Sequence, residues 1–281
     1  MPKIKIVSDS TCDLTKDLLD EHEIDIVPLF VNFKEESYRD LEDIQTEKMY
    51  ELVDKCGILP KTTAATPGSF HDTFKKYLDE GYQILYIGLG SKFSATYSSA
   101  NIAKQMLESE NIHLIDSANL SSGIGLLLLK AAKYREQGMD ILEIVSRIEE
   151  TVPKVRSQFV IDTLEYLNKG GRVSSLSALM GGMLRIKPII KVRNGEMHVG
   201  KKARGSITKG IDLLIKEYLD HIDNIDNEFV MVTHSLAHES YLYIKEKIKG
   251  KGIKNLYETS AGCVISSHCG KGTIGILYIE N

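Results

Sequence analysis

Short apolar runs alternate with amphipathic stretches along the first half of the chain. Runs rich in β-branched and aromatic residues predict strands at residues 3–7, 24–31, 83–89 and 112–116. A helical spacing follows the first strand over about residues 13–21, and the last two strands also lead through polar loops into helices. This alternation predicts parallel strands joined by crossover helices.

A helix that begins near Thr66 has clear local signals. Thr66 can cap the first turn, and Pro67 suits the first helical position because its missing N–H is not needed there. Phe70, Phe74 and Tyr77 then recur at helical spacing. We expect these three rings to pack in the core.

The second half mixes antiparallel signals with helices. Strands are predicted at 159–162, 188–192, 197–201, 229–233 and 273–279, and helices at 163–168, 175–184, 207–219 and 238–249. Asn194-Gly195 lies between two alternating runs, which predicts a β-hairpin. The helical pattern breaks at 151–158. We therefore predict an α/β fold with two α/β domains: residues 1–156 with a mostly parallel sheet and crossover helices, and residues 157–281 with a mixed α/β arrangement.

Charge and composition narrow the classes of function. The chain has 35 Lys and Arg against 39 Asp and Glu, a net charge of −4, and no Trp. It therefore lacks the basic footprint and stacking platforms typical of nucleic-acid binding. The four cysteines are too sparse for a disulfide scaffold, the N-terminus does not resemble a signal peptide, and the longest apolar block, residues 124–129, is far short of the ~20 residues that span a bilayer. We expect a cytoplasmic protein.

Several common catalytic and cofactor motifs are absent. The sequence contains no GxxxxGK[ST] phosphate loop and no GxSxG nucleophile elbow. Residues 270–275 match GxGxxG, but a predicted strand follows them where a dinucleotide site needs a helix. His234 and His238 are four residues apart without an acidic or Cys partner at metal spacing, so we predict surface or loop histidines and no metal or cofactor.

The predicted strand ends carry short polar side chains. In an open α/β sheet, ligands bind beyond the carboxyl ends of the strands, where this chain has residues 8–10, 91–96 and 116–117. Ser94 would also open a helix, whose free amides favour an anion. Ser10, Asp13 and Ser117 are interpreted as ordinary caps and turns. Thr62 and Thr63 have no capping role because Thr66 already caps the next helix.

These segments resemble the DegV family of bacterial fatty-acid-binding proteins. The matching motifs, in order, are DST-x-DL at 9–14, PKTT at 60–63, PG-x-F at 67–70, GS-x-x-S-x-TY-x-SA at 90–100, DS at 116–117, LEYL-x-KGGRVS at 164–174, KPI at 187–189 and SHCG-x-GT-x-G at 267–275. Each motif is weak alone, but their joint order is specific and runs in register over residues 4–279.

The resemblance implies a lipid carrier with two α/β domains. A long-chain fatty acid such as palmitate or oleate would lie in an apolar tunnel with its carboxylate at the domain junction. Thr62 and Ser94 would hold that carboxylate, and Thr63, Arg172 and His268 would complete the polar network. The family's role in lipid transport and fatty acid metabolism implies no catalytic residue, cofactor or metal.

The resemblance also implies a protein partner. Some members deliver the acid to an ATP-dependent, dihydroxyacetone-kinase-like fatty acid kinase, which makes an acyl phosphate for phospholipid synthesis. Arg204, beyond the hairpin, is the candidate contact with that kinase. The absence of a transmembrane segment is compatible with transient contact at a membrane surface.

The sequence departs from the family pattern at two places. Residues 63–65 read Thr-Ala-Ala where members commonly have Ser-Gln-Pro, so this loop lacks a rigid proline. Ala95 stands where members usually have Gly, which would matter if the backbone there needed a positive φ or a very close approach to the ligand.

The residue types suit a fatty acid. Burying about 14 methylenes at ~0.8 kcal/mol each gives about 11 kcal/mol of transfer free energy. A buried carboxylate needs hydrogen bonds, which Thr62 and Ser94 can donate, and Arg172 adds a planar charged donor. His268 could hydrogen-bond the carboxylate and titrate near neutrality. The segments 124–129 and 175–184 could line the tunnel or form ordinary core.

Two alternatives come from other classes. One is a hydrolase or phosphotransferase that uses Ser94 or His268 chemically. The other is a DNA-associated regulator, against which the net negative charge and the lack of an evident helix-turn-helix argue.

Overall fold

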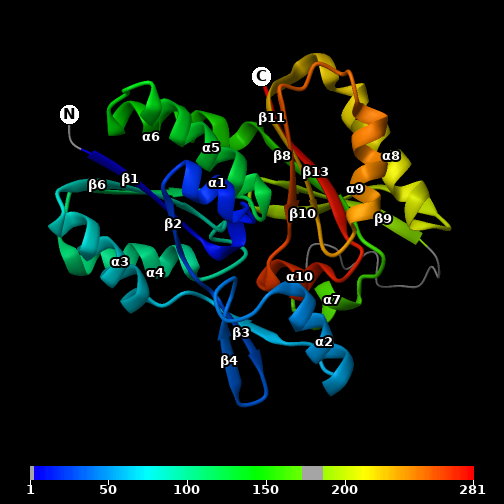
Figure 1. The fold of residues 1–281 in the computed structure, drawn as a ribbon, viewed down its shortest axis with the longest axis horizontal. Helices are drawn as coiled ribbons and strands as arrows, with labels where there is room; N and C mark the ends of the chain where they lie inside the picture. The colour runs from blue at the N-terminus through cyan, green and yellow to red at the C-terminus, as the bar shows by residue number, and fades with distance from the viewer. Residues whose placement is uncertain (1–2, 173–185) are drawn as a thin grey trace.

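The computed structural model describes residues 3–172 and 186–281 (Figure 1). The helix predicted at 175–184 lies outside the described residues. The helices are α1 (Lys16–Glu21), α2 (Thr46–Cys56), α3 (Pro67–Asp79), α4 (Thr96–Leu107), α5 (Ser122–Glu136), α6 (Ile141–Thr151), α7 (Glu165–Lys169), α8 (Ile207–Asp220), α9 (His238–Ile248) and α10 (Cys263–Cys269).

Within the described residues the strands form three sheets. The first is wholly parallel, in the order β2-β1-β6-β7, from β1 (Lys3–Asp9), β2 (Ile24–Val27), β6 (Tyr82–Gly88) and β7 (Ile112–Asp116). The second sheet has the order β10-β9-β8-β13-β11-β12, and β11 and β12 are its parallel pair. Its strands are β8 (Val155–Val160), β9 (Ile186–Arg193), β10 (Glu196–Arg204), β11 (Ile225–His234), β12 (Asn255–Ser260) and β13 (Ile274–Glu280). The third is antiparallel, in the order β4-β3-β5, from β3 (Phe30–Phe33), β4 (Glu36–Arg39) and β5 (Lys61–Thr63). The predicted α/β class is confirmed, with a parallel first sheet and a mixed second sheet.

Helix α5 lies between the two larger sheets. It contacts β1 and β6 on one side and β8, β11 and β13 on the other. Every residue from Ser122 to Ala132 is therefore buried, as expected for a helix enclosed on all sides. The apolar block 124–129 belongs to this helix, and none of its residues is among those that line the pocket described below.

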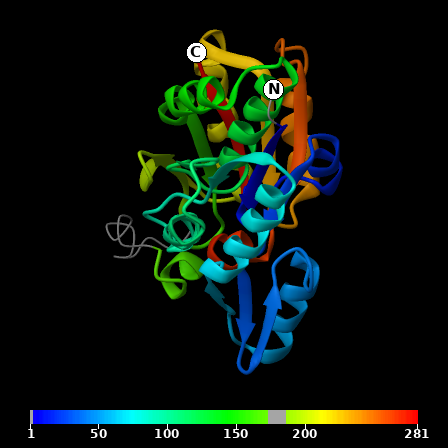
Figure 2. The same cartoon turned by 90° about the vertical axis from the view of Figure 1, so that its left-hand side faces the viewer.

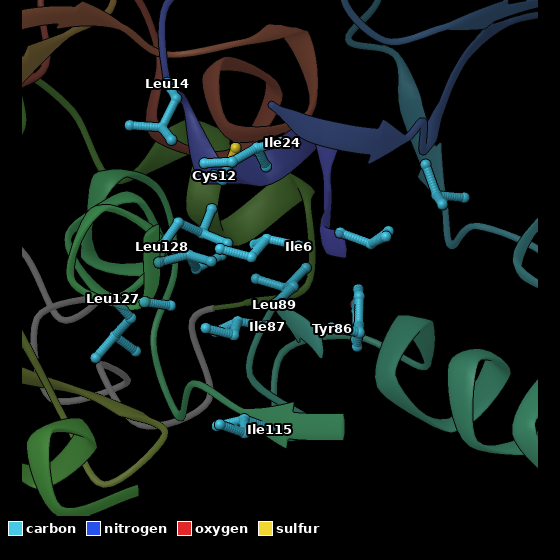
Figure 3. Close-up of a cluster of buried hydrophobic side chains, with 14 of the residues drawn as sticks. Ile6, Cys12, Leu14, Ile24, Tyr86, Ile87, Leu89, Ile115, Leu127 and Leu128 are labelled. Atoms are coloured by element: carbon cyan, nitrogen blue, oxygen red, sulfur yellow. The ribbon is translucent and has the colours of Figure 1, made fainter. Parts of the chain in front are cut away.

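The parallel sheet is covered on both faces. Figure 3 shows Ile6 and Ile87 pointing from this sheet toward Leu128 of α5, while Tyr86 points to the opposite side. There the Tyr86 ring meets Phe70 and Phe74 of α3 at centroid distances of 5.1 and 6.3 Å. The predicted core position of Phe70, Phe74 and Tyr77 is confirmed, since all three are buried.

The third sheet forms a lobe together with α2. Both views place β3, β4 and α2 at the lower end of the molecule (Figures 1 and 2). The strand predicted over 24–31 is wrong as one element, because β2 ends at Val27 in the first sheet and β3 begins at Phe30 in the third. Pro28 between them has no N–H for a ladder hydrogen bond, so the chain leaves the parallel sheet there.

Other element boundaries differ in smaller ways. The helix predicted from residue 13 begins at Lys16, because Asp13 has a φ of 52° and Thr15 is the N-cap. β4, β5, β12 and α10 are not among the predicted elements, whereas the Asn194-Gly195 hairpin between β9 and β10 is confirmed. The domain division at residues 156 and 157 stays a prediction; it falls inside β8.

Two buried carboxylates hold the start of α10. Asp13 Oδ1 accepts a hydrogen bond from the Gly262 amide at 2.8 Å, and Asp40 Oδ1 accepts one from the Cys263 amide at 2.8 Å. Burial raises the pKa of Asp13 well above its usual value and that of Asp40 to about 6. Asp13 is thus more than the cap or turn residue expected from the sequence, because it joins segments 249 residues apart.

The raised pKa of Asp40 predicts a pH-dependent stability. Because its folded pKa of about 6 exceeds the ordinary value of 3.8 for an aspartate, its contribution to stability falls as pH rises from about 4 to about 6, by at most about 3 kcal/mol. In urea unfolding at several pH values, we expect the free-energy difference between wild type and Asp40→Asn to fall across that window.

Asp43→Asn is the matched control for this experiment. Hydrogen bonds from Arg39 lower the pKa of the exposed Asp43 below its ordinary value. The difference in unfolding free energy between wild type and Asp43→Asn should therefore stay level between pH 4 and 6. A wild-type minus Asp40→Asn difference that is constant or rises with pH would contradict the assignment.

Candidate functional site

A pocket opens where several elements far apart in sequence meet. Thr62 and Thr63 come from β5, Ser94 precedes α4, Arg172 follows α7, and His268 ends α10. All five residues that the resemblance named line this one pocket. Arg204 is not among its lining residues and lies exposed at the end of β10.

Some of the polar side chains lie toward the open side of the pocket. Arg172 and Thr63 are exposed and Thr62 is partly buried, whereas the apolar lining is more enclosed. That apolar lining includes Leu29, Leu89, Phe93, Leu120, Val264 and Leu277. No carboxylate is among the described lining residues. The pocket is therefore amphipathic, with donor groups at its mouth and a mostly apolar interior that also contains a few buried hydroxyls.

Thr62 and His268 form the central polar contact. Thr62 Oγ1 lies 2.9 Å from His268 Nε2, across 206 residues of sequence. Ring nitrogen Nδ1 of His268 is buried and has no hydrogen-bond partner among the described residues. We assign the hydrogen to Nε2, because an orphan acceptor costs less than an orphan N–H in the interior. His268 then donates to Thr62 Oγ1, which leaves the Thr62 hydroxyl hydrogen free for a ligand.

The His268 ring is neutral at pH 7. Burial, with a smaller contribution from the Arg172 charge, lowers its pKa to about 4. The expectation that His268 titrates near neutrality is therefore wrong, because desolvation disfavours the imidazolium.

Gly170 makes room for the His268 ring. A Cβ atom at this position would lie 2.2 Å from His268 Nδ1 and 3.0 Å from the Tyr166 carbonyl oxygen. The next residue, Gly171, has no neighbour around its missing Cβ but adopts a φ of 70°. The two glycines of the KGGR segment thus have different physical roles, one for space and one for backbone conformation.

Ser94 is held by the first residue of α4. Its Oγ accepts from the Thr96 amide at 3.2 Å and lies 2.9 Å from Thr96 Oγ1. If the Thr96 hydroxyl donates in that pair, the Ser94 hydroxyl hydrogen is free to donate into the pocket. Ala95 has a φ of −73°, which any residue can adopt. The backbone at this position therefore does not need the glycine that the family pattern has there.

Arg172 bridges the two sides of the mouth. Its guanidinium donates to the Gly170 carbonyl oxygen at 2.8 Å and to the Phe93 carbonyl oxygen at 3.4 Å. It forms no ion pair with a carboxylate in the described part of the chain. Its positive charge is therefore not neutralised locally and can attract an anionic group.

Deeper hydroxyls in the pocket are bonded among themselves. Thr233 Oγ1 lies 2.7 Å from both Ser122 Oγ and Thr259 Oγ1, and those two atoms are also 2.7 Å apart. Ser235 is similarly paired with Tyr50 and Ser266. No sequence signal identified these groups, because their partners come from distant segments.

His234, His238 and Glu258 form a cluster beside the pocket. Glu258 Oε1 lies 2.9 Å from His234 Nε2 and 2.5 Å from His238 Nδ1. The sequence predicts a surface or loop histidine without an acidic partner. Both expectations are wrong for His234, which is buried at the end of β11 and has an acidic neighbour. The spacing in sequence could not show Glu258, which comes from β12.

The cluster suits hydrogen bonding better than metal ligation. The Ala237 amide donates to His234 Nδ1 at 3.2 Å, which places the ring hydrogen on Nε2, the atom that faces Glu258. A metal at Nε2 would require that hydrogen to move to Nδ1, against the Ala237 N–H. Two histidines and Glu258 therefore form a hydrogen-bonded network here.

The fold and this pocket define an α/β protein with an amphipathic ligand pocket beside its sheets. A family model described as an uncharacterised protein of the DegV family matches residues 3–281. A DegV domain-containing protein of Clostridium acetobutylicum is 39% identical over 280 residues, covering 100% of this chain and 99% of that protein. The chain belongs to the DegV family.

Solved structures share the whole fold. A DegV family protein from Thermus thermophilus, described as binding fatty acid, matches with a TM-score of 0.93 at 26% identity, covering 99% of this chain and 100% of that one. A stearic acid-binding protein from Eubacterium ventriosum matches with a TM-score of 0.89 at 28% identity, covering 99% and 98%. Across the described residues, no helix is both long and apolar enough to cross a bilayer.

Gly170→Ala should displace His268 from Thr62. The added Cβ would overlap the ring, and overpacking of this kind costs about 1–3 kcal/mol of stability. The ¹⁵N and ¹H resonances of the His268 ring, followed by NMR, should shift markedly. Gly171→Ala is the control, since it strains the backbone at positive φ but adds no contact, and should leave the ring resonances in place. Unchanged ring resonances in Gly170→Ala would refute the steric role.

Proposed function

We propose that this protein binds one long-chain fatty acid, with the carboxylate at the mouth of the pocket. The observation that carries the proposal is the convergence of the Thr62 and Ser94 hydroxyls and the Arg172 guanidinium in one pocket, beside His268, whose lining is mostly apolar. The descriptions of the solved relatives as fatty-acid-binding proteins support it. Palmitate, stearate and oleate are the chain types to test.

Each donor suits a carboxylate for a physical reason. The hydroxyl oxygens of Thr62 and Ser94 already accept hydrogen bonds from other groups, so both hydroxyl hydrogens can be donated to a ligand. Arg172 adds the positive charge, and Thr63 lies beside Thr62 on β5, with its hydroxyl accepting from Asn32 at 2.9 Å. A carboxylate that loses water is stabilised by several such donors at once.

The lining of the pocket suits an acyl chain. Most of the lining surface that the structure describes is apolar, and Leu29, Leu89 and Leu277 contribute to it. Burying about 14 methylenes at ~0.8 kcal/mol each would favour entry of the chain by about 11 kcal/mol.

The site fits a carrier better than an enzyme. Ser94 is paired with Thr96, and no hydrogen bond joins it to His268 within the described residues. Thr62 does meet His268, but a ring with a pKa of about 4 is a weak base at pH 7, and its other nitrogen has no orienting partner. The hydrolase or phosphotransferase alternative therefore lacks an activated nucleophile here.

We further propose that the bound acid is presented to a fatty acid kinase. Acyl-phosphate formation needs the carboxylate near the surface, and the exposed Arg172 and Thr63 mark that end of the pocket. Arg204 lies exposed at the end of β10, opposite Ile186 of β9. A kinase that uses ATP in the cytoplasm would make this protein a cytoplasmic carrier for phospholipid synthesis.

Removing the two hydroxyls should abolish capture of the carboxylate. In the double variant Thr62→Ala and Ser94→Ala, loss of two hydrogen bonds to a charged group should weaken palmitate binding at least about 100-fold. Isothermal titration or native mass spectrometry measures the effect. The control double variant Thr73→Ala and Ser98→Ala removes two hydroxyls outside the pocket and should bind normally. Wild-type affinity in the first variant would refute the head-group assignment.

Arg204→Ala should separate lipid binding from kinase turnover. Palmitate affinity should stay within about twofold of wild type, because Arg204 is outside the pocket lining. Acyl-phosphate formation by a cognate kinase should fall at limiting carrier concentration. Lys202→Ala, on the same strand, is the control. Equal turnover with wild type and Arg204→Ala would remove Arg204 from the contact.

A further inference from the structure

Four buried hydroxyls line the interior of the pocket that has Thr62 and Ser94 at its mouth. These interior hydroxyls belong to Ser121, Thr233, Ser235 and Thr273, and each of the four residues is at most 6% exposed. The hydroxyls of Thr62 and Ser94 have hydrogens to donate to a ligand. Whether the interior hydroxyls also have free hydrogens decides which polar groups of a ligand can be buried beside them.

Thr233 belongs to a closed ring of three hydroxyls. Its Oγ1 donates to Ser122 Oγ at 2.7 Å, and Thr259 Oγ1 lies 2.7 Å from both of these oxygens. Because each hydroxyl has one hydrogen, all three contacts are filled only when each member donates to the next. Each oxygen of the ring then keeps one lone pair and has no free hydrogen.

Ser235 belongs to an open chain of hydroxyls that ends on a backbone carbonyl. Ser266 Oγ donates to the Ala261 carbonyl oxygen at 3.1 Å, so the hydrogen in the 2.8 Å contact between Ser235 Oγ and Ser266 Oγ comes from Ser235. Tyr50 Oη lies 2.7 Å from Ser235 Oγ and is therefore the donor in that pair. The Ser235 hydrogen is thus used within the protein.

The other two interior hydroxyls donate to fixed acceptors. Ser121 Oγ donates to Asp13 Oδ2 at 2.5 Å. Thr273 Oγ1 donates to the Cys269 carbonyl oxygen at 2.8 Å. All four interior hydroxyls therefore donate their hydrogens to other groups of the protein.

The interior side chains accept hydrogen bonds from a ligand but have none to donate. The imidazole of His234, which also lines the pocket, has both ring nitrogens engaged, with Glu258 and with the Ala237 amide. The interior hydroxyl oxygens keep lone pairs. A ligand hydroxyl can donate to such an oxygen. A ligand ketone or second carboxylate only accepts, so it would lose its hydrogen bonds with water without replacement.

We propose that the interior hydroxyls make the pocket selective among oxygenated fatty acids, so that it binds hydroxy acids and rejects keto acids and dicarboxylic acids of the same length. This inference rests on the proposed binding of a fatty acid. A purely apolar interior would not favour a hydroxyl over a ketone, because it satisfies neither group. The same asymmetry keeps the carboxylate of the ligand at the mouth, where the free donors are.

Paired hydroxystearates and oxostearates, with the oxygen on the same carbon, test the proposal. Their affinities for the full-length, lipid-free protein are measured by isothermal titration, with stearate as the reference. At one or more carbons in the distal half of the chain, the hydroxy acid should bind at least about fivefold tighter than the oxo acid. Next to the carboxyl group this preference should vanish, because hydrogens of Thr62, Ser94 and Arg172 can serve a carbonyl there.

Two variants each remove one interior hydroxyl. Thr233→Val keeps the shape of the side chain, and Ser235→Ala removes only the oxygen. In at least one of them the ratio of hydroxy-acid to oxo-acid affinity should fall at least about threefold, because an acceptor is lost. Thr73→Val, which removes a hydroxyl outside the pocket lining, is the matched control and should keep the wild-type ratio.

Two results would overturn this proposal and leave fatty acid binding intact. The first is tight binding of stearate together with oxo acids that bind as well as, or better than, the hydroxy acids at every distal carbon. The second is an affinity ratio that neither Thr233→Val nor Ser235→Ala lowers while both variants still bind stearate. Failure of the wild-type protein to bind stearate, palmitate and oleate would refute the proposed function, and this inference with it.

Discussion

The fold depends on the burial of α5 on all sides. This helix packs against the parallel sheet on one face and against β8, β11 and β13 on the other, so the two sheets cannot separate without exposing it. Its one charged residue in the enclosed stretch, Lys130, remains because Asp226 and Glu228 both lie 2.5 Å away. The loop that leads into α5 is fixed as a result. Leu120 and Ser121 of that loop form part of the wall of the pocket.

The mouth of the pocket around Thr62 and His268 depends in turn on α10. This short helix comes late in the chain, yet residues of the first half hold it: Asp13 and Asp40 accept from its first amides, and Thr46 Oγ1 donates to the Ala261 carbonyl oxygen. Burying two carboxylates is unfavourable, and the backbone N–H groups offset that cost. His268, at the other end of α10, thereby keeps a fixed position against Thr62.

Sequence patterns could predict the elements with strong periodicity but not the contacts between distant segments. The parallel strands and the Asn194-Gly195 hairpin follow from local composition. In contrast, β4 and β5 are short, and β12 (NLYETS) carries little apolar alternation. The pocket residues were named through motif resemblance, and the structure brings them together. The role of Gly170 could not be predicted from the sequence. This glycine leaves space for the ring of His268, which is 98 residues further along the chain. The contact between Glu258 and His234 could not be predicted either, because it joins side chains from two different strands, β12 and β11.

The protonation state of His268 links the structure to the proposed function. A charged imidazole at the mouth would add a second cation beside Arg172, and desolvation prevents this at pH 7. The neutral ring instead supplies a hydrogen to Thr62 and so orients the Thr62 hydroxyl toward the ligand. In the proposed function, this arrangement would hold a carboxylate by hydroxyl donors and one guanidinium charge without activating a nucleophile. In the proposed carrier role, release of the acid breaks no covalent bond to the protein, but these donors have to be replaced and the acyl chain has to leave its apolar surroundings.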